Sequence, residues 1–275
     1  MKKSVLVTGA SSGIGLATAQ RLARDGWQVF GTSRTAAFGE VRDGLMMLPM
    51  NVDEEASVND GIAWVLEQGP RLDAVVSNAG WSLVGPLEET TDGELQAQLN
   101  THLLGPHRLV RAVLPAMRAQ NAVGGKRAHL VFVGSIAGRI GLPFQGAYSA
   151  SKFALAGWAQ SLRLELVAFD IRVTLVEPGD VRTGFSSARR FTPAHSDDSH
   201  YREALTRALN VTLEGERTGP PPSVVADAIA DVLATSSPPP RQTVGRLADR
   251  VSAWAADLLP DRLAEALKRK FFDVS

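Results

Sequence analysis

The sequence contains no cysteine among its 275 residues. This absence excludes disulfide bonds, a zinc site with cysteine ligands and a thiol nucleophile. Charge of either sign is not in excess, because Lys plus Arg and Asp plus Glu both number 29. A nucleic-acid-binding protein should carry a basic excess or a basic stripe, so this balance argues against that class. We therefore expect no nucleic-acid partner and no metal site.

Long apolar runs are also absent. No stretch of about 18 consecutive apolar residues occurs, so no transmembrane helix is expected. The N-terminal MKKSVLVTGA has a short apolar run that stops at a glycine, whereas a secretory signal has a longer apolar region and a small-residue cleavage site. We expect a soluble, cytoplasmic protein without an integral membrane segment.

Short apolar runs rich in β-branched residues alternate with helical patterns, such as those at 15–26 and 151–169. Runs that are apolar nearly throughout are typical of strands buried on both faces of a parallel sheet. The alternation predicts an α/β fold: a three-layer, doubly wound (Rossmann) sheet of about seven parallel strands, with helices on both faces, in one domain over 1–275. The strands are expected at 4–9, 27–32, 44–52, 72–78, 128–135 and 171–178.

The pattern becomes less regular after residue 183. Residues 184–222 are rich in Ser, Arg, Asp and Pro, and we expect a flexible flap there, over a site at the carboxyl ends of the strands. A helix is predicted at 223–235 and a stiff connector at 236–241. The region 245–275 is predicted to be a helical extension, with one helix over 251–272. It could close over an apolar substrate, pair subunits or lie on a membrane surface, and packing on its own chain or on a partner subunit is the interpretation we favour.

The segment TGASSGIG (8–15) follows the first strand and opens the first helix. Gly9 permits a tight turn off the strand, Gly13 allows the backbone to approach a pyrophosphate, and Gly15 allows close packing of helix and strand. The start of the helix then offers free N–H groups to the phosphates. A merely tight turn is the alternative interpretation. The predicted phosphate-binding residues are Gly9, Ser11, Ser12, Gly13, Ile14 and Gly15.

The end of the second strand indicates which dinucleotide binds. An Asp or Glu usually lies there when the cofactor lacks a 2′-phosphate. This chain has Ser33 and Arg34 instead, and a guanidinium can pair with a 2′-phosphate that a carboxylate would repel. NADP(H) is therefore favoured over NAD(H), unless Arg34 is only a solvated surface residue. Asn51 and Val52, at the end of the third strand, are predicted to contact the adenine.

Five motifs occur in an order that resembles the short-chain dehydrogenase/reductase family, over residues 4 to about 235. They are TGASSGIG, SNAG (77–80), Ser135 within VGSIAG, YSASK (148–152) and EPGDVRT (177–183). Ser33 and Arg34 resemble the NADP-preferring pattern of this family. The segment GRIGLPFQGAYSASKFAL is similar to members that act on steroids, retinoids and other apolar carbonyls or alcohols. The resemblance implies an NADP-dependent oxidoreductase, and a homodimer or homotetramer that pairs through helices around 94–118 and 148–169.

The resemblance implies a catalytic role for Ser135, Tyr148 and Lys152. Tyr148 would give a proton to the substrate oxygen, or take it in the oxidative direction. A free phenol is a poor base at neutral pH, but Lys152 lies one helical turn away, and its charge, with that of the oxidised nicotinamide, would lower the phenol pKa. Ser135 would donate a hydrogen bond to the substrate oxygen. Lys152 would also hold the nicotinamide ribose.

Further contacts follow from the same resemblance. Backbone contacts to the cofactor are implied for Asn78, Ala79 and Gly80, and a nicotinamide pocket for Pro178, Gly179, Val181 and Thr183. Four residues flank the presumed substrate site and would make it apolar, although some could equally pack in the core: Leu142, Phe144, Gln145 and Phe185.

Two other functions stay open beside the leading one. The chain could be a catalytically impaired NADP(H)-binding regulator or scaffold, which the intact Ser135, Tyr148 and Lys152 argue against. It could also be an epimerase or dehydratase on the same fold, but those relatives usually have a longer substrate region.

The stretch NTHLLGP (100–106) departs from the family pattern. The family has a catalytic Asn in this helix, and here His102 occupies that position, with Asn100 about 200° away around the helix. Family members use the main-chain carbonyl of this residue to hold a water in a proton relay to the lysine. Pro106 has no N–H to bond the His102 carbonyl. We therefore predict that the backbone keeps the relay, while the imidazole either holds a kink or titrates; the alternative is a packing histidine in a disabled relay.

Overall fold

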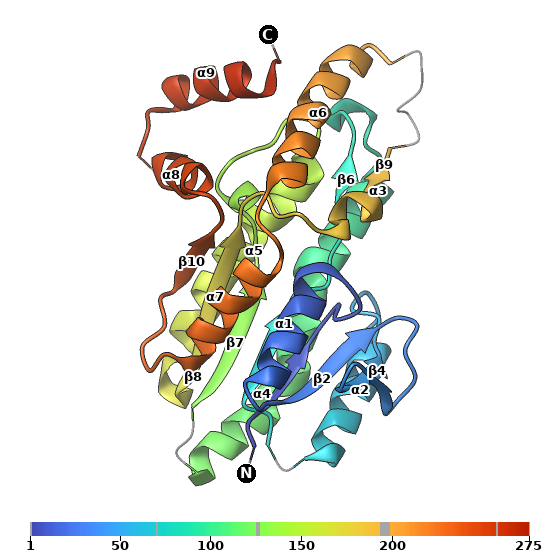
Figure 1. The fold of residues 1–275 in the computed structure, drawn as a ribbon, viewed down its shortest axis with the longest axis vertical. Coiled ribbons are helices and arrows are strands. Elements are labelled where there is room, and N and C mark those ends of the chain that lie inside the picture. The colour runs from blue at the N-terminus through green and yellow to red at the C-terminus, as the bar shows by residue number, and fades with distance from the viewer. Residues whose placement is uncertain (1, 70, 125–126, 193–198, 257, 275) are drawn as a thin grey trace.

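The computed structural model describes residues 2–69, 71–124, 127–192, 199–256 and 258–274 (Figure 1). Within these residues, eight strands form one sheet, and all neighbouring strands run parallel except one pair at an edge. The strands are Ser4–Val7 (β1), Gln28–Ser33 (β2), Glu40–Arg42 (β3), Leu45–Pro49 (β4), Ala74–Ser77 (β5), Ala128–Val133 (β7), Ile171–Pro178 (β8) and Arg241–Val244 (β10). Their order is β3-β4-β2-β1-β5-β7-β8-β10, which confirms the doubly wound α/β prediction.

The two outermost strands were not predicted from the sequence. β3 pairs antiparallel with β4 through a turn at Asp43 and Gly44, both of which have positive φ. β10 follows the proline-rich connector and pairs with β8. Both strands are short and mostly polar, so they carry no apolar run that would mark them.

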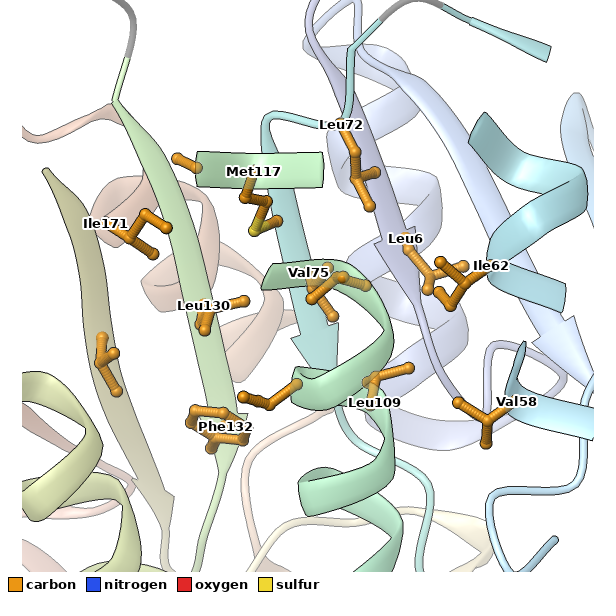
Figure 2. Packing of buried hydrophobic residues seen from close by; sticks show 14 of the residues in the cluster. Leu6, Val58, Ile62, Leu72, Val75, Leu109, Met117, Leu130, Phe132 and Ile171 are labelled. Carbon is orange, nitrogen blue, oxygen red and sulfur yellow. The ribbon is translucent and has the colours of Figure 1, made fainter. Parts of the chain in front are cut away.

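Helices cover both faces of the sheet. Those that pack around the two central clusters are Gly13–Arg24 (α1) and Ser223–Ala234 (α7) on one face, and Glu55–Gln68 (α2), Gly105–Gly124 (α4) and Gly146–Glu165 (α5) on the other. Side chains of β1 alternate between the faces: Leu6 joins the cluster under α2, α4 and α5, whereas Val5 and Val7 join the one under α1. Figure 2 shows Leu6, Val75 and Leu130 from three strands meeting Ile62 and Leu109 from the helices.

This double burial fixes the carboxyl ends of the strands. Leu6 and Leu130 expose 1% or less of their surface. Burying such a side chain contributes about 1.5–3 kcal/mol. The loops that leave β1, β2, β5, β7 and β8 at the carboxyl edge therefore start from a rigid platform, which is where ligands bind in open α/β sheets.

The predicted helix around 94–118 is divided. Asp92–Leu99 (α3) begins with a capping box between Thr91 and Glu94, and is followed by a π-helical turn at Asn100–Leu104 (η2) before α4. The Gly105 N–H bonds the carbonyl of Asn100, five residues back. Pro106 supplies no N–H to the His102 carbonyl four residues before it, which accounts for a wider turn at this place.

The region after β8 is more regular than predicted. Within the expected flap, 184–222, the structure has Gly184–Ala188 (η5), the strand Arg190–Phe191 (β9), and a long helix, Arg202–Thr218 (α6); residues 193–198 lie outside the described residues. β9 pairs with the short strand Leu83–Val84 (β6). Other short turns are Leu87–Glu89 (η1), Ile136–Gly138 (η3) and Val167–Phe169 (η4).

The C-terminal extension consists of two helices where one was predicted. Leu247–Ala256 (α8) ends before Pro260, and Asp261–Phe272 (α9) begins after it, because proline cannot continue a helix from the preceding turn. Figure 1 shows α9 next to the upper end of α6, and residues of the two helices are in contact. No helix among the described residues is long and apolar enough to cross a bilayer.

Candidate active site

A cavity of about 1070 Å³ lies at the carboxyl edge of the sheet. Its walls begin at the glycine loop and at Arg34, continue past Ser135, Tyr148 and Lys152, and end at α6, α8 and α9. The sheet topology brings these segments together, because each loop leaves a parallel strand at the same edge.

The glycine loop has the backbone that its sequence predicts. Gly9 and Gly13 have φ of 66° and 54°, which side chains rarely adopt. A Cβ on Gly15 would overlap the Gly9 carbonyl and lie 2.5 Å from Nδ2 of Asn78, so Gly15 is needed for close packing rather than for the cavity wall.

Asn78 ties the glycine loop to the central strand β5. Its Nδ2 donates to the Thr8 carbonyl at 3.0 Å, and the buried Thr8 hydroxyl accepts from the N–H groups of Asn78 and Ala79 at 2.9 and 3.1 Å. The start of the glycine loop is therefore fixed to the end of β5 by hydrogen bonds.

The start of α1 fits a dinucleotide phosphate. The N-cap residue Ser12 makes no side-chain cap, and the first turn of α1 has no acidic residue. Its first N–H groups face a ligand cradle that Gly13 leaves open, since a Cβ there would meet only the Thr183 side chain, at 3.6 Å. Uncapped N–H groups at a helix start attract a phosphate through hydrogen bonds and the helix dipole.

The end of the cavity at Arg34, where adenosine is predicted to bind, is polar. Arg34 is exposed and lines the cavity, and Ser33 is buried with its hydroxyl 3.2 Å from that of Thr35. Asn51 also lines this end, although its Nδ2 donates to Glu54 at 2.7 Å. Val52 is next to it, with its carbonyl bonded to Arg108 at 3.1 Å.

Ser135, Tyr148 and Lys152 meet at the middle of the cavity. Ser135 follows β7 and hydrogen-bonds the Tyr148 hydroxyl. Lys152 is one turn further along α5, with its Nζ 5.7 Å from the centre of the Tyr148 ring and 2.9 Å from the Val133 carbonyl, to which it donates. The structure thus brings together the three residues that the sequence predicts to be catalytic.

Burial dominates the electrostatics of Tyr148 and Lys152. Desolvation raises the pKa of Tyr148 to about 12, although its hydrogen bond with Ser135 acts in the opposite direction. Desolvation also lowers the pKa of Lys152 to about 7. The expected lowering of the phenol pKa by Lys152 is therefore not seen for the protein groups alone, because both groups are almost fully removed from water and Lys152 bonds a backbone carbonyl.

His102 points toward the segment that follows SNAG. Its Nε2 is 2.7 Å from the Trp81 carbonyl and 3.1 Å from the Trp81 N–H, and its ring meets that of Tyr148 edge to face at 5.6 Å. Burial, then the charge of Lys152, lowers the pKa of His102 well below its usual value. A neutral imidazole that holds the Trp81 backbone fits this geometry better than a titrating one.

Asn100 bonds residues other than the three predicted to be catalytic. Its Nδ2 donates to the Asp53 carbonyl at 3.3 Å and its Oδ1 accepts from Arg108 at 2.8 Å. It therefore lies on the side of η2 toward the adenosine end, as expected for a residue about 200° from His102. A second polar residue that the sequence did not mark, Gln98, is fully buried and bonds both the Trp81 carbonyl and the Leu83 N–H.

The substrate side is partly as predicted. Leu142, Gln145 and Phe185 line the cavity, and the Phe185 ring is 6.0 Å from that of Tyr148. Phe144 is the exception: it does not line the cavity, and its ring contacts Tyr201 at 6.3 Å. Its positive φ of 59° turns the chain there, so its side chain leaves the direction of its neighbours.

The remaining predicted cofactor residues also surround the cavity. Ala79 and Gly80 lie beside Asn78, and the segment after β8 adds the residues predicted to surround the nicotinamide: Pro178, Gly179, Val181 and Thr183. The sequence did not predict that Arg189 and Glu216 line the cavity, because their separation from the motifs leaves no spacing signal. Closure of the C-terminal extension over the site was one of the open alternatives, and α8 and α9 do form the far wall of the cavity.

Comparisons with known proteins agree with this geometry. Residues 3–193 match the family model for short chain dehydrogenases. The chain is 36% identical to a 3-ketodihydrosphingosine reductase of Bacteroides thetaiotaomicron over 272 residues, covering 98% of each protein. It is 34% identical to retinol dehydrogenase 8 of Bos taurus, covering 87% of this chain and 80% of the relative.

The fold matches solved structures over nearly its whole length. The crystal structure of a short-chain dehydrogenase from Streptomyces avermitilis superposes with a TM-score of 0.81 at 31% identity, covering 99% of this chain and 97% of the other. Other matched structures were solved in complex with NAD or with NADP+. The chain therefore belongs to the short-chain dehydrogenase/reductase family and is an NAD(P)-dependent oxidoreductase acting on a carbonyl or alcohol group.

Proposed function

We propose that the protein is an NADP(H)-dependent oxidoreductase that interconverts a ketone or aldehyde and an alcohol on a small, largely apolar molecule. The observation that carries this proposal is the meeting of Ser135, Tyr148 and Lys152 at the middle of one cavity, between the glycine loop and an apolar far wall. The bound dinucleotide would supply or accept the hydride.

The side chains support specific roles around the reacting oxygen. Tyr148 keeps its proton at neutral pH, since its pKa is raised to about 12, so it can donate that proton to the oxygen during reduction. Ser135 is within hydrogen-bonding distance of the same hydroxyl and would donate to the oxygen as charge develops. Lys152 would hold the ribose hydroxyls and support the phenol.

Arg34 supports the choice of NADP(H). It is exposed at the adenosine end, and no hydrogen bond or ion pair ties its guanidinium to another of the described residues. It would be available for a 2′-phosphate, with the Ser33 and Thr35 hydroxyls next to it.

The far wall supports an apolar substrate. α8, α9 and the turn between them contribute Ala255, Leu259, Leu267 and Phe271 to the cavity, so the C-terminal extension would close over a substrate tail. A relative that matches nearly end to end is named for a reaction on 3-ketodihydrosphingosine, and another for retinol. We propose long-chain ketones and alcohols as the substrate class.

One assay tests the function. NADPH oxidation is followed with a panel of apolar ketones and aldehydes that includes 3-ketodihydrosphingosine and retinal, for the wild type and Tyr148→Phe. We expect turnover of at least one carbonyl and a loss of about a hundredfold or more in Tyr148→Phe. A rate that Tyr148→Phe leaves unchanged would contradict the mechanism.

A second candidate function is a regulator or scaffold that binds NADP(H) without catalysis. His102 supports it, because this residue occupies the position of a catalytic Asn in the family. That function gains if NADPH binds tightly while no carbonyl or alcohol of the panel is turned over. Against it, we propose that the relay to Lys152 is kept by the main chain at His102, where Pro106 supplies no competing N–H.

A further inference from the structure

An arginine is buried in the substrate half of the cavity without enough partners. Arg189 lies directly before β9, and its side chain exposes only 2% of its surface. Its Nη2 pairs with Oε1 of Glu216 on α6. Its Nε and Nη1 have no hydrogen-bond partner among the described residues.

Leaving donors of a buried cation unpaired is costly. A buried polar group without a partner destabilises the folded protein, and more so when it is charged. Arg189 is also held firmly, since the next residue donates its N–H to the Ser82 carbonyl at 2.9 Å and Thr192 donates to Val84 at 3.0 Å. Arg189 lines the cavity, and its two unpaired donors are covered in the unliganded protein, so a group bound at this wall would complete their hydrogen bonds once the neighbouring side chains shift.

The position of Arg189 relates it to the substrate rather than to the phosphates. Arg189 and Glu216 line the same cavity as Tyr148. Phe185, which is four residues before Arg189, packs beside the Tyr148 ring. The glycine loop and Arg34 are at the other end of the cavity wall.

The charge of the surroundings selects a neutral partner. Glu216, Asp180 and Asp249 all line this part of the cavity. Burial, followed by the charges of Asp249 and Glu216, raises the pKa of Asp180 to about 6. A carboxylate would meet repulsion from these groups, whereas a hydroxyl or carbonyl oxygen can accept from Arg189 without it.

We propose that Arg189 is a substrate-binding residue, whose Nε and Nη1 donate to a second, neutral oxygen of the substrate while the reacting carbonyl lies at Ser135 and Tyr148. This inference rests on the proposed function and narrows it: the substrate is a long-chain ketone, or the matching alcohol, that also carries a hydroxyl or carbonyl oxygen. The Arg189–Glu216 pair would select such molecules over plain apolar ketones.

The test compares matched ketones of one chain length. One is unsubstituted, and the others carry a hydroxyl α, β or γ to the carbonyl; a keto acid of the same length forms the charged arm. kcat/KM is measured with NADPH, and Kd is measured by calorimetry on the enzyme with NADP+. The readout is the ratio of hydroxyketone to plain ketone, which cancels any general loss of activity.

Three variants sharpen the comparison. Arg189→Lys keeps a cation opposite Glu216 but loses the forked donors, and Arg189→Met combined with Glu216→Gln removes both charges, so that neither leaves Glu216 as an unpaired buried charge. Arg182→Lys, at an exposed arginine outside the cavity wall, is the matched control. Thermal melting and NADPH affinity are measured for each protein.

We expect the wild type and Arg182→Lys to prefer one hydroxyketone by about tenfold or more, since a hydrogen bond to a charged group has that effect on affinity. Both Arg189 variants should bring the ratio near one, with NADPH affinity unchanged. A wild-type ratio near one at every hydroxyl position overturns the proposal, as does a preference that survives in the variants. Tighter binding of the keto acid overturns the assignment to a neutral oxygen.

The outcomes also separate this inference from the proposed function. If the plain ketone is reduced and no hydroxyketone is preferred, the proposed role of Arg189 is refuted, whereas the proposed oxidoreductase function is not. If no ketone is reduced, the function fails, and the Kd ratios alone decide whether Arg189 binds a neutral oxygen. A parallel loss of NADPH affinity in the Arg189 variants would instead assign the residue to the cofactor.

Discussion

Lys152 should make the unliganded protein less stable at neutral pH than at higher pH. Its ammonium is buried, and desolvation lowers its pKa from 10.5 to about 7. The folded protein therefore binds its proton less readily than the unfolded chain does. Because the pKa of Lys152 is lower in the folded protein, its contribution to the free energy of unfolding is complete above pH 10.5. This contribution decreases as the pH falls and is fully lost below about pH 7.

The magnitude follows from these two pKa values. Between pH 9 and pH 7 the unfolded chain is almost fully protonated at this site, while the folded protein goes from nearly unprotonated to half protonated. Integrating the linkage relation over that interval gives a loss of about 2 kcal/mol. Tyr148 does not contribute, because its pKa is raised from 10.0 to about 12 and its effect is lost only as the pH rises through that range.

Urea unfolding at pH 7 and pH 9, without cofactor, measures this difference. In Lys152→Met, which keeps a stem of similar length, the wild-type loss of about 2 kcal/mol between the two pH values should disappear. Tyr148→Phe is the control and should follow the wild type within this window. Parallel pH dependences for the wild type and Lys152→Met would mean that Lys152 stays charged when folded, and would refute the reasoning.

Four further results are expected. Arg34→Ala should lower the NADPH-over-NADH ratio of kcat/KM by about ten- to hundredfold, and an unchanged ratio would assign Arg34 to the solvated surface. His102→Asn should leave the pH profile of kcat unshifted, because burial keeps the imidazole neutral. Pro106→Ala should slow turnover about tenfold, because it restores an N–H to the His102 carbonyl. Unchanged turnover and helix geometry in Pro106→Ala would exclude the backbone relay. Phe153→Arg, at an exposed aromatic on α5, should reduce the sedimenting species from a dimer or tetramer to a monomer, and a monomeric wild type would contradict this pairing.

The central strands and the glycine loop could be predicted because their physics is local. β1, β5, β7 and β8 are apolar runs buried on both faces. Gly9 and Gly13 have positive φ, a backbone conformation that glycine adopts readily. The edge strands could not, since β3 and β10 are stabilised by one neighbour each and carry polar residues. The division of the C-terminal extension into α8 and α9 was also missed, because apolar residues continue at helical spacing on both sides of Pro260.

The substrate half of the site depends on contacts between distant segments, so the sequence could not give it. Phe144 is next to a cavity-lining residue, yet its positive φ sends it toward Tyr201. In the sequence, Arg189 is one charged residue among several in a polar stretch. Only the fold, which places Glu216 of α6 opposite to it, distinguishes it from the others. Such positions acquire a chemical meaning only through tertiary packing, whereas the spacing of Tyr148 and Lys152 on one helix carries it directly.

The position of His102 is explained only by the sequence and the structure together. The sequence indicates that an imidazole replaces the family Asn and that Pro106 removes an N–H, and the structure adds the neighbour that makes the exchange possible. A Cβ on Gly80 would lie 2.6 Å from Cε1 of His102, so the larger ring fits only because this position is glycine. With that space, Nε2 reaches the Trp81 carbonyl and fastens the loop after β5 to η2. The ring is thus anchored to the backbone in a turn that Pro106 widens, so the imidazole at this position has a structural partner of its own.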